Sequence, residues 1–208
     1  MSDKSGFYYP NKGGRISFIA LEEVMGKNGI SAVLNMAGLS HFIDNYPSDD
    51  LKREFDFADF GALNQALEDM YGPRGARGLA LRMGRAAFAH VIRDFGSMVG
   101  MADLAFKVLP LGTKLKVGIR AMAETFTKIS DQTSRVEEDE EKFTYIIERC
   151  PVCWGRKTDR PVCFQAVGIL QEGLRWVSGG KDFKVEEILC VAKGDPTCTF
   201  IVDKEPTG

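Results

Sequence analysis

Histidines and nucleotide-binding motifs are scarce in this sequence. Its 208 residues include only two histidines, His41 and His90, and contain no Gly-x-Gly-x-x-Gly fingerprint, phosphate loop or obvious flavin site. Such motifs let the backbone approach the phosphates of a cofactor, so their absence argues against a nucleotide-dependent enzyme. His90 falls on a predicted helix beside Phe88 and is expected to face the core or a cavity. Titration near neutral pH is the one reason to consider a chemical role for it.

Neither sign of charge dominates, and long apolar runs are also missing. The chain has 27 Lys and Arg against 29 Asp and Glu, for a net charge of −2. Nucleic acid is therefore not expected as the main partner, because phosphate binding needs a concentrated positive field. No run approaches the roughly 20 apolar residues of a membrane span. The first residues, MSDKSGFYYPNKGG, lack the apolar region of a signal peptide. We expect a cytoplasmic protein without a membrane span.

All five cysteines lie in the last third of the chain, at positions 150, 153, 163, 190 and 198. In a cytoplasmic protein, structural disulfides are rare, and clustered cysteines more often bind metal or carry out redox chemistry. Five is also an odd number, which weakens a purely disulfide framework.

The hydrophobic pattern predicts an α+β fold, with a helical N-terminal two-thirds packed on a C-terminal antiparallel sheet. Residues 1–14 are predicted to form a flexible or partner-bound arm, and residues 15–208 a single domain with no internal linker or repeat. Helical spacing ends near residue 130, and alternation typical of strands follows it. The expected helices are 16–25, 30–39, 58–71, 73–96 and 112–130. A β-β-α-β-β unit follows, with strands within 134–150, a helix from about Pro161 to Gly179 and a hairpin within 183–204.

Three glycines, Gly75, Gly78 and Gly84, lie inside the longest predicted helix. Each costs up to about 1 kcal/mol relative to alanine at such a position. The usual reason to keep them is close approach of a neighbouring backbone or a bulky ligand, and we favour close helix packing.

The predicted hairpin brings two cysteines together. If the hairpin is centred on Gly194, Cys190 lies opposite Cys198, with Cβ atoms about 4.5–5.5 Å apart. Two thiolates at that separation can share one zinc ion, which needs about four tetrahedral ligands. Cys163 can supply a third ligand, because a helix N-terminus favours a thiolate.

The fourth ligand stays open at this point. Cys150 or Cys153 would complete a four-sulfur site, and Glu187 is the other option. Strict alternation places Glu187 on the opposite face of its strand from Cys190, so that option needs a bulge. The Cys-Pro-Val-Cys pair also matches a redox motif, but WGRKTDRP separates it from the helix that such a site would open. Metal binding is favoured over redox chemistry and over inert buried thiols.

Three segments together resemble the 4-vinyl reductase (4VR) domain family of small-ligand and hydrocarbon-binding proteins. They are ERCPVCWGRKTDRPVC, VGILQEGLRW and VEEILCVAKGDPTCTF, and MYGPRGARGLALRMGRAAF is similar to the long helix of that family. The resemblance implies a fold like that of TRAPP vesicle-tethering subunits, usually dimeric, with an apolar pocket between helices and sheet. Relatives include sensor domains of phenol-responsive activators and a protein tied to bacteriochlorophyll synthesis. The zinc ligands of the phenol sensors correspond to Cys163, Glu187, Cys190 and Cys198; Cys150 and Cys153 are additional to that set.

The resemblance and the composition together predict a binding domain for a hydrophobic or aromatic small molecule, acting as a sensor or carrier and stabilised by a structural zinc ion. A homodimer is expected. One alternative is an accessory protein or reductase for the vinyl group of a chlorophyll precursor, a tetrapyrrole. A second is an assembly protein like the tethering subunits. No catalytic residue is assigned, and a zinc held by four protein ligands leaves no open position for chemistry. Candidate pocket walls are Phe88, His90, Phe95, Met98, Met101, Phe106, Met122, Phe126 and Trp154.

Overall fold

The computed structural model describes residues 4–95 and 108–207, and it has the expected α+β architecture. The N-terminal elements are β1 (Tyr8–Pro10), α1 (Asn11–Met36), β2 (Arg53–Asp56) and α2 (Phe57–Phe95), with a short 3-10 helix at Ser40–Phe42. After α4 (Leu111–Ile129) come β3 (Ser134–Glu138), β4 (Lys142–Ile147), α5 (Phe164–Ser178), β5 (Phe183–Leu189), a 3-10 helix at Val191–Lys193 and β6 (Cys198–Pro206).

Both long N-terminal helices are kinked at a glycine. Gly26 in α1 has φ +75°, and Gly72 in α2 has φ +67°. An L side chain rarely adopts this left-handed conformation, so glycine is the residue that can interrupt the helix there. Pro73 follows at the start of the second half of α2, where its fixed φ suits a first turn. The predicted breaks near Gly26 and at Gly72 are therefore confirmed, although α1 begins at Asn11 rather than Ile16.

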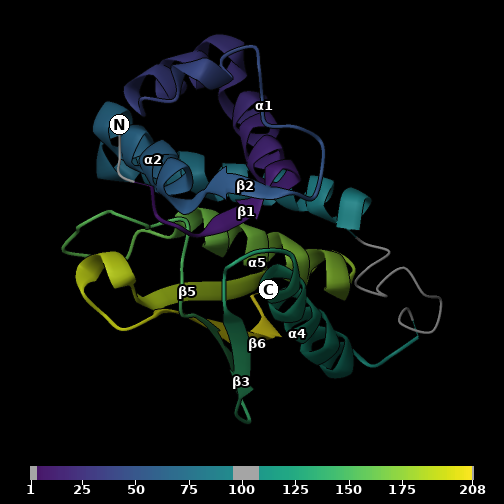
Figure 1. The fold of residues 1–208 in the computed structure, drawn as a ribbon. Coiled ribbons are helices and arrows are strands. Elements are labelled where there is room, and N and C mark those ends of the chain that lie inside the picture. The colour runs from purple at the N-terminus through teal and green to yellow at the C-terminus, as the bar shows by residue number, and fades with distance from the viewer. Residues whose placement is uncertain (1–3, 96–107, 208) are drawn as a thin grey trace.

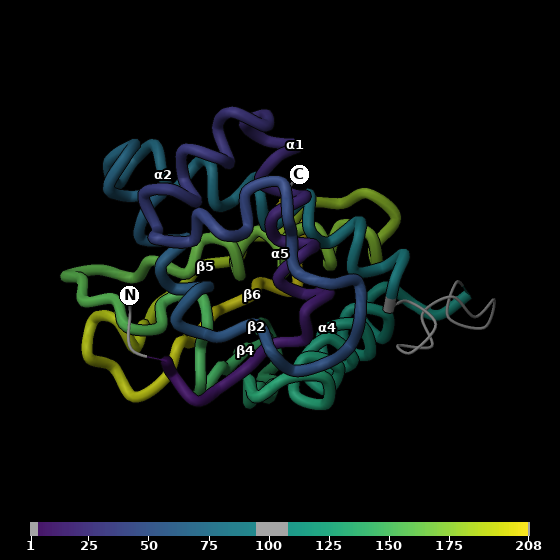
Figure 2. Tube along the Cα trace, turned by 45° about the horizontal axis from the view of Figure 1, so that its top comes forward, coloured from purple at the N-terminus to yellow at the C-terminus, as the bar shows by residue number. Residues whose placement is uncertain are grey.

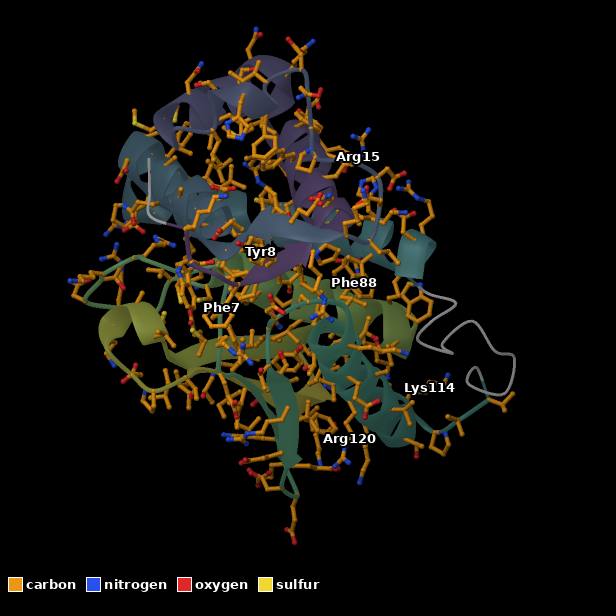
Figure 3. The ribbon with its side chains drawn as sticks, in the orientation of Figure 1. Phe7, Tyr8, Arg15, Phe88, Lys114 and Arg120 are labelled. Atoms are coloured by element: carbon orange, nitrogen blue, oxygen red, sulfur yellow. The ribbon has the colours of Figure 1, made fainter. Side chains whose placement is uncertain are left out.

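The segment expected to be an arm packs on the domain over residues 5–14. Tyr8–Pro10 pairs antiparallel with Arg53–Asp56 in a two-stranded sheet, which the sequence pattern did not reveal. Asp56 joins this segment to α2, because its Oδ1 accepts hydrogen bonds from the Ser5 hydroxyl (2.5 Å) and the Ala58 amide (2.8 Å). The second bond is the N-terminal cap predicted for this helix. Figure 3 labels Phe7 and Tyr8 on this segment, where the Phe7 ring packs edge-on against Trp154.

The C-terminal unit is a four-stranded antiparallel sheet in the order β3-β4-β6-β5. The expected β-β-α-β-β order is confirmed, with α5 between the two strand pairs along the chain. Figures 1 and 2 show α5 lying between α1 and α2 on one side and the strands β5 and β6 on the other. The molecule is thus layered, with the N-terminal helices over α5 and α5 over the sheet. None of the described helices is long and apolar enough to cross a membrane.

Two glycines hold α2 and α5 close together where they cross. A Cβ added at Gly84 would lie 2.1 Å from the carbonyl oxygen of Gln165, and one at Gly168 would lie 2.3 Å from that of Leu81. Both contacts are with backbone, so neither position accepts a side chain without separating the helices. Close helix packing is therefore the reason for Gly84. It is not the reason for Gly78, where an added Cβ would meet no described atom within 4 Å.

Candidate metal centre and the adjoining cavity

Four separate elements bring the five cysteines into one buried cluster. Cys150 and Cys153 lie in a tight turn after β4, Cys163 caps the N-terminus of α5, Cys190 follows β5, and Cys198 begins β6. Each is at most 2% exposed. The turn of 150–156 is fixed on α2 from outside, because Arg156 forms an ion pair with Glu68 (2.6 Å).

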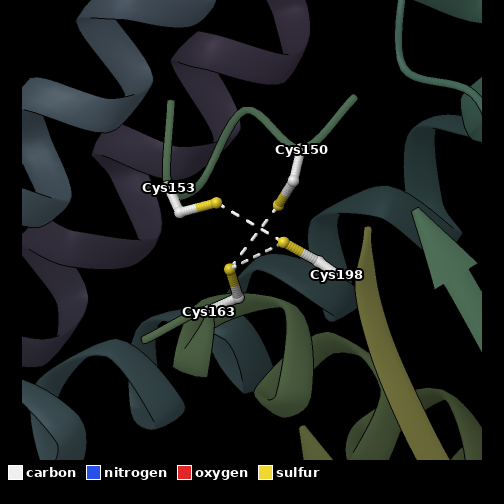
Figure 4. A group of neighbouring side chains, drawn as sticks. All are labelled: Cys150, Cys153, Cys163 and Cys198. Atoms are coloured by element: carbon white, nitrogen blue, oxygen red, sulfur yellow. Dashed lines mark hydrogen bonds between the residues drawn. The ribbon is translucent and has the colours of Figure 1, made fainter. Parts of the chain in front are cut away.

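The sulfur atoms are spaced as the ligands of a tetrahedral metal ion would be. Cys150 lies 3.6 Å from Cys163, and Cys153 lies 3.4 Å from Cys198, measured between Sγ atoms. Cys163 lies 3.7 Å from Cys198, and these contacts are drawn in Figure 4, where the four side chains point toward one another. Cys163 also lies 3.8 Å from Cys190. A tetrahedron with Zn–S bonds of about 2.3 Å has edges of roughly 3.8 Å, so a zinc ion fits this spacing.

Glu187 joins the cluster because the β5–β6 register shifts. Glu186 pairs with Ile201 and Glu187 with Phe200, but Leu189 pairs with Thr199. One residue of β5 is therefore inserted between Glu187 and Leu189, which turns Glu187 to the same side as Cys190. The predicted objection to Glu187, based on strict alternation, was wrong because of this irregularity. Beyond it, the register is the one expected for a hairpin centred on Gly194.

The Glu187 carboxyl group is buried and only half satisfied. Its Oε2 accepts a hydrogen bond from the backbone amide of Cys163 (2.7 Å). Its Oε1 is buried and has no hydrogen-bond partner among the described residues. Burial raises the pKa of Glu187 to about 9, and the neighbouring Cys190 thiolate raises it further. A buried carboxylate oxygen without a partner is costly, and it is the kind of atom that a metal ion would satisfy.

The thiols divide into groups that favour opposite protonation states. Hydrogen bonds from Cys150 and from the other cysteines lower the pKa of Cys153. Burial raises the pKa of Cys163 well above its usual value, and its thiol partners raise it further. A divalent cation reverses this second preference, because a coordinating thiol loses its proton.

Two complete sets of four ligands exist within this cluster. One is Cys150, Cys153, Cys163 and Cys198; the other is Cys163, Glu187, Cys190 and Cys198. Within each set the ligand atoms lie within 4.8 Å of one another, and all of the residues are buried. Both alternatives for the fourth ligand are thus assembled. Thiolates with a carboxylate suit zinc among the common metals.

The contacts give little support to a Cys-x-x-Cys redox pair. The five cysteines are free thiols. The nearest sulfur contacts recorded for Cys150 and Cys153 run across the cluster, to Cys163 and Cys198.

An apolar cavity of about 70 Å³ adjoins the metal centre. It lies among α1, α2, α4, α5 and the sheet, and its few polar groups gather at one end. There the Tyr9 hydroxyl donates to Oε1 of Gln132 (2.6 Å). Pro151 and Val152, the two residues between Cys150 and Cys153, form part of its wall. The remaining side chains that the argument below uses are Val91, Phe126 and Ile169.

The predicted pocket walls are dispersed in the structure. Phe126 lines the cavity. Phe88 and Met122 instead pack beside Gly173, where α2, α4 and α5 meet. Trp154 packs against Phe7 and Phe57.

The other candidates do not define a wall. The Nε2 of His90 lies 2.8 Å from Glu23 at the surface. Met98, Met101 and Phe106 lie outside the described residues, as does the side chain of Phe95. Sequence reasoning missed Tyr9, which fell in the expected arm, and Gln132, a buried polar residue between helix and strand.

Comparisons with known proteins agree with this architecture. Residues 143–204 match the model of the 4-vinyl reductase (4VR) domain, which confirms the family resemblance over that segment. No curated protein sequence matches the chain.

Similar solved structures include an H-NOX protein studied for heme distortion (12% identity, 96% of this chain and 97% of that chain, TM-score 0.61). Another is an Fe(II) unliganded H-NOX protein from K. algicida (16%, 94% and 96%, 0.57). A third is the phenol-responsive sensory domain of the transcription activator PoxR with phenol (23%, 73% and 77%, 0.50). These neighbours are H-NOX and sensory domains rather than the tethering subunits that the resemblance implied.

The heme of the H-NOX neighbours does not fit this chain. The described cavity wall contains no histidine, cysteine or methionine that could serve as an axial ligand, and its Tyr9 hydroxyl is already bonded to Gln132. The cavity of about 70 Å³ is also far below the roughly 300–1,000 Å³ of ordinary ligand pockets. The likeness to H-NOX proteins is therefore one of fold.

Proposed function

We propose that this chain is a binding domain through which a small apolar or aromatic molecule is sensed or carried, with a structural zinc ion fixing one wall of the binding cavity. One observation carries the proposal. Pro151 and Val152 line the cavity, and the cysteines on either side of them belong to the metal-binding cluster. The state of the metal centre and the shape of the cavity therefore share one short segment.

The cavity suggests the class of ligand. Its wall is mostly apolar, and the Tyr9–Gln132 pair offers a hydroxyl and an amide oxygen at one end. This arrangement suits a small ring that carries one polar group. An engineered cavity of about 150 Å³ binds benzene, so about 70 Å³ implies that side chains move outward when such a ring enters. The similarity to a phenol-responsive sensory domain supports the same class.

The zinc site contributes stability in this proposal. Cys163, Glu187, Cys190 and Cys198 would hold the ion, which links the start of α5 to the β5–β6 hairpin. A zinc ion bound by four protein ligands supplies a cross-link and a positive charge, with no open position for substrate. The chain's own residues bind the small molecule, exclude water around it and orient its polar group. We further propose a cytoplasmic homodimer as the working form.

A tetrapyrrole ligand is not favoured. A chlorophyll precursor is similar in size to heme and meets the same objection from the cavity volume. The assembly alternative keeps one supporting observation, which is the exposed helix surface at Gly75 and Gly78 that no described residue covers. A monomer in sedimentation experiments would remove that support.

Phenol is a suitable first probe. We expect saturable binding of phenol by calorimetry, and we expect Val91→Phe to weaken it at least tenfold, because the larger ring fills the cavity. Val117 on α4 is 42% exposed and outside the cavity, so Val117→Phe is the matched control and should bind as the wild type does. Equal loss of binding in both variants, or no binding of phenol, benzene or toluene by the wild type, would contradict the proposal.

A further inference from the structure

We infer that the cysteine cluster holds two divalent metal ions, bridged by the thiolates of Cys163 and Cys198. This inference rests on the zinc site proposed above and adds a second ion to it. The first ion would take Cys163, Glu187, Cys190 and Cys198. The second would take Cys150, Cys153, Cys163 and Cys198. Six side chains thus give each ion four ligands, with two of them shared.

The geometry of the shared pair supports this assignment. Two tetrahedra that share an edge require the bridging sulfur atoms to lie at one edge length, which is roughly 3.8 Å for zinc. The Sγ atoms of Cys163 and Cys198 are 3.7 Å apart. Outward from this edge, Cys150 and Cys153 contact it at 3.6 and 3.4 Å, and Cys190 contacts it at 3.8 Å. The cluster therefore extends from the shared edge toward both ligand sets. Modules that bind two zinc ions with six cysteines provide the chemical precedent.

Neither single-ion arrangement uses all of the buried ligands. An ion in the four-sulfur set leaves Glu187 with a buried oxygen that has no partner among the described residues. An ion in the Glu187 set leaves Cys150 and Cys153 unused, although their Cys-x-x-Cys spacing is that of a zinc knuckle. Two ions satisfy every member of the cluster.

An iron–sulfur cluster fits less well. Its iron and sulfide atoms separate the cysteine ligands, whereas the sulfur atoms here are already in contact at 3.4–3.8 Å. The short contacts indicate single ions bound directly by neighbouring thiolates.

The second ion would also place a metal directly behind the cavity wall. Its ligands Cys150 and Cys153 flank Pro151 and Val152, which line the cavity. Loading of this ion would fix the turn, and movement of the turn on ligand entry would change its affinity by the same factor, since such coupling is reciprocal.

The number of ions is measured by native mass spectrometry of the whole chain. Metal-free protein is reloaded with Zn²⁺ and dialysed against a weak chelator to remove loosely bound metal. We expect two zinc ions per chain in the wild type. One ion should remain in the double variant Cys150→Ser/Cys153→Ser, and one in Glu187→Gln/Cys190→Ser. One ion in the wild type, retained in the first double variant, would overturn the inference while leaving the proposed site intact. A wild type that binds no zinc would overturn both.

The bridge itself is tested on the zinc-loaded wild type, which does not depend on a variant folding. X-ray absorption should show a metal–metal scattering shell, because ions that share two thiolates are close neighbours. Two ions without this shell would overturn the bridged arrangement. For the variants, circular dichroism separates loss of an ion from loss of the fold, and loss of the fold removes that variant from the count.

Discussion

The helical N-terminal region and the C-terminal unit of β-β-α-β-β bury their interiors with different chemistry. In the first, aromatic rings pack on one another, as Phe18 does against Phe42, Tyr46 and Phe55 with ring centres 5.3–5.6 Å apart. In the second, a group of five thiols and a carboxyl group occupies one end of the unit. Apolar contacts stabilise by removing surface from water, whereas a cluster of ligands stabilises only with its metal. The two regions should therefore respond to different perturbations.

Metal removal should have the largest effect, and it should act on one region. Structural zinc contributes on the order of 10 kcal/mol to folding in small zinc domains. We expect chelation to lower the free energy of unfolding by several kcal/mol and to remove hydrogen-exchange protection first from residues 143–204. Residues 11–71 should keep more of their protection, because their core contains none of the proposed ligands. Uniform loss of protection along the chain would show that the regions are not separable in this way.

The converse change removes an aromatic side chain from the first region. Phe18 is fully buried, and Phe18→Ala should cost about 3–5 kcal/mol, because it removes apolar contacts and leaves a cavity. Its zinc content, measured by mass spectrometry, should equal that of the wild type. A variant that loses zinc in proportion to stability would show that the metal centre depends on the aromatic core.

The junction between the regions should be sensitive at one glycine and tolerant at another. Gly84→Ala forces the α2 and α5 backbones apart, since the new Cβ would lie 2.1 Å from the oxygen of Gln165, and overpacking of this kind costs about 1–3 kcal/mol. Gly78→Ala on the same helix meets no described atom and should stabilise by up to about 1 kcal/mol. Thermal unfolding of both variants measures the contrast. Similar melting temperatures for the two would mean that α2 and α5 are not in close contact.

The same contrast explains what could be predicted from the sequence. Helix breaks at Gly26 and Gly72 were predictable because glycine favours positive φ. The pairing of Cys190 with Cys198 was predictable because the hairpin is symmetrical about Gly194. Local rules of this kind require only a few neighbouring residues.

Features that depend on distant contacts were not predictable. The strand at Tyr8–Pro10 is three residues long and pairs with a segment more than 40 positions away. The place of Glu187 depends on a register shift that alternation cannot show. The cavity wall was missed because an apolar residue facing a cavity, such as Ile169, has the same helical spacing as a core residue such as Phe88.

The smallest expected effect concerns the tip of the C-terminal sheet, where charge rather than metal or apolar burial holds β3 to its neighbours. Glu138 lies within 2.8 Å of Lys116, 3.3 Å of Arg120 and 3.0 Å of Lys204, and Figure 3 labels Arg120 on α4. Hydrogen bonds from Lys116 and Lys204 lower the pKa of Glu138 to about 2. Because the folded-state pKa lies below the unfolded value of 4.5, the stabilisation is complete above about pH 5 and is lost as the pH falls toward 2.

Solvent screens these partly exposed partners, so the contribution should be about 1 kcal/mol. Urea unfolding of the wild type and of Glu138→Gln, from pH 6 to pH 2.5, measures it as a difference in which acid release of metal affects both proteins alike. The difference should shrink as the pH falls. Glu140 forms no ion pair with any residue that the structure describes, so Glu140→Gln should differ little from the wild type at any pH. If the Glu138→Gln difference is the same at pH 6 and pH 2.5, the three cations do not stabilise the ionised carboxylate. The hairpin would then depend on its strand pairing and on the apolar face of the sheet, as the rest of the unit does away from its cysteines.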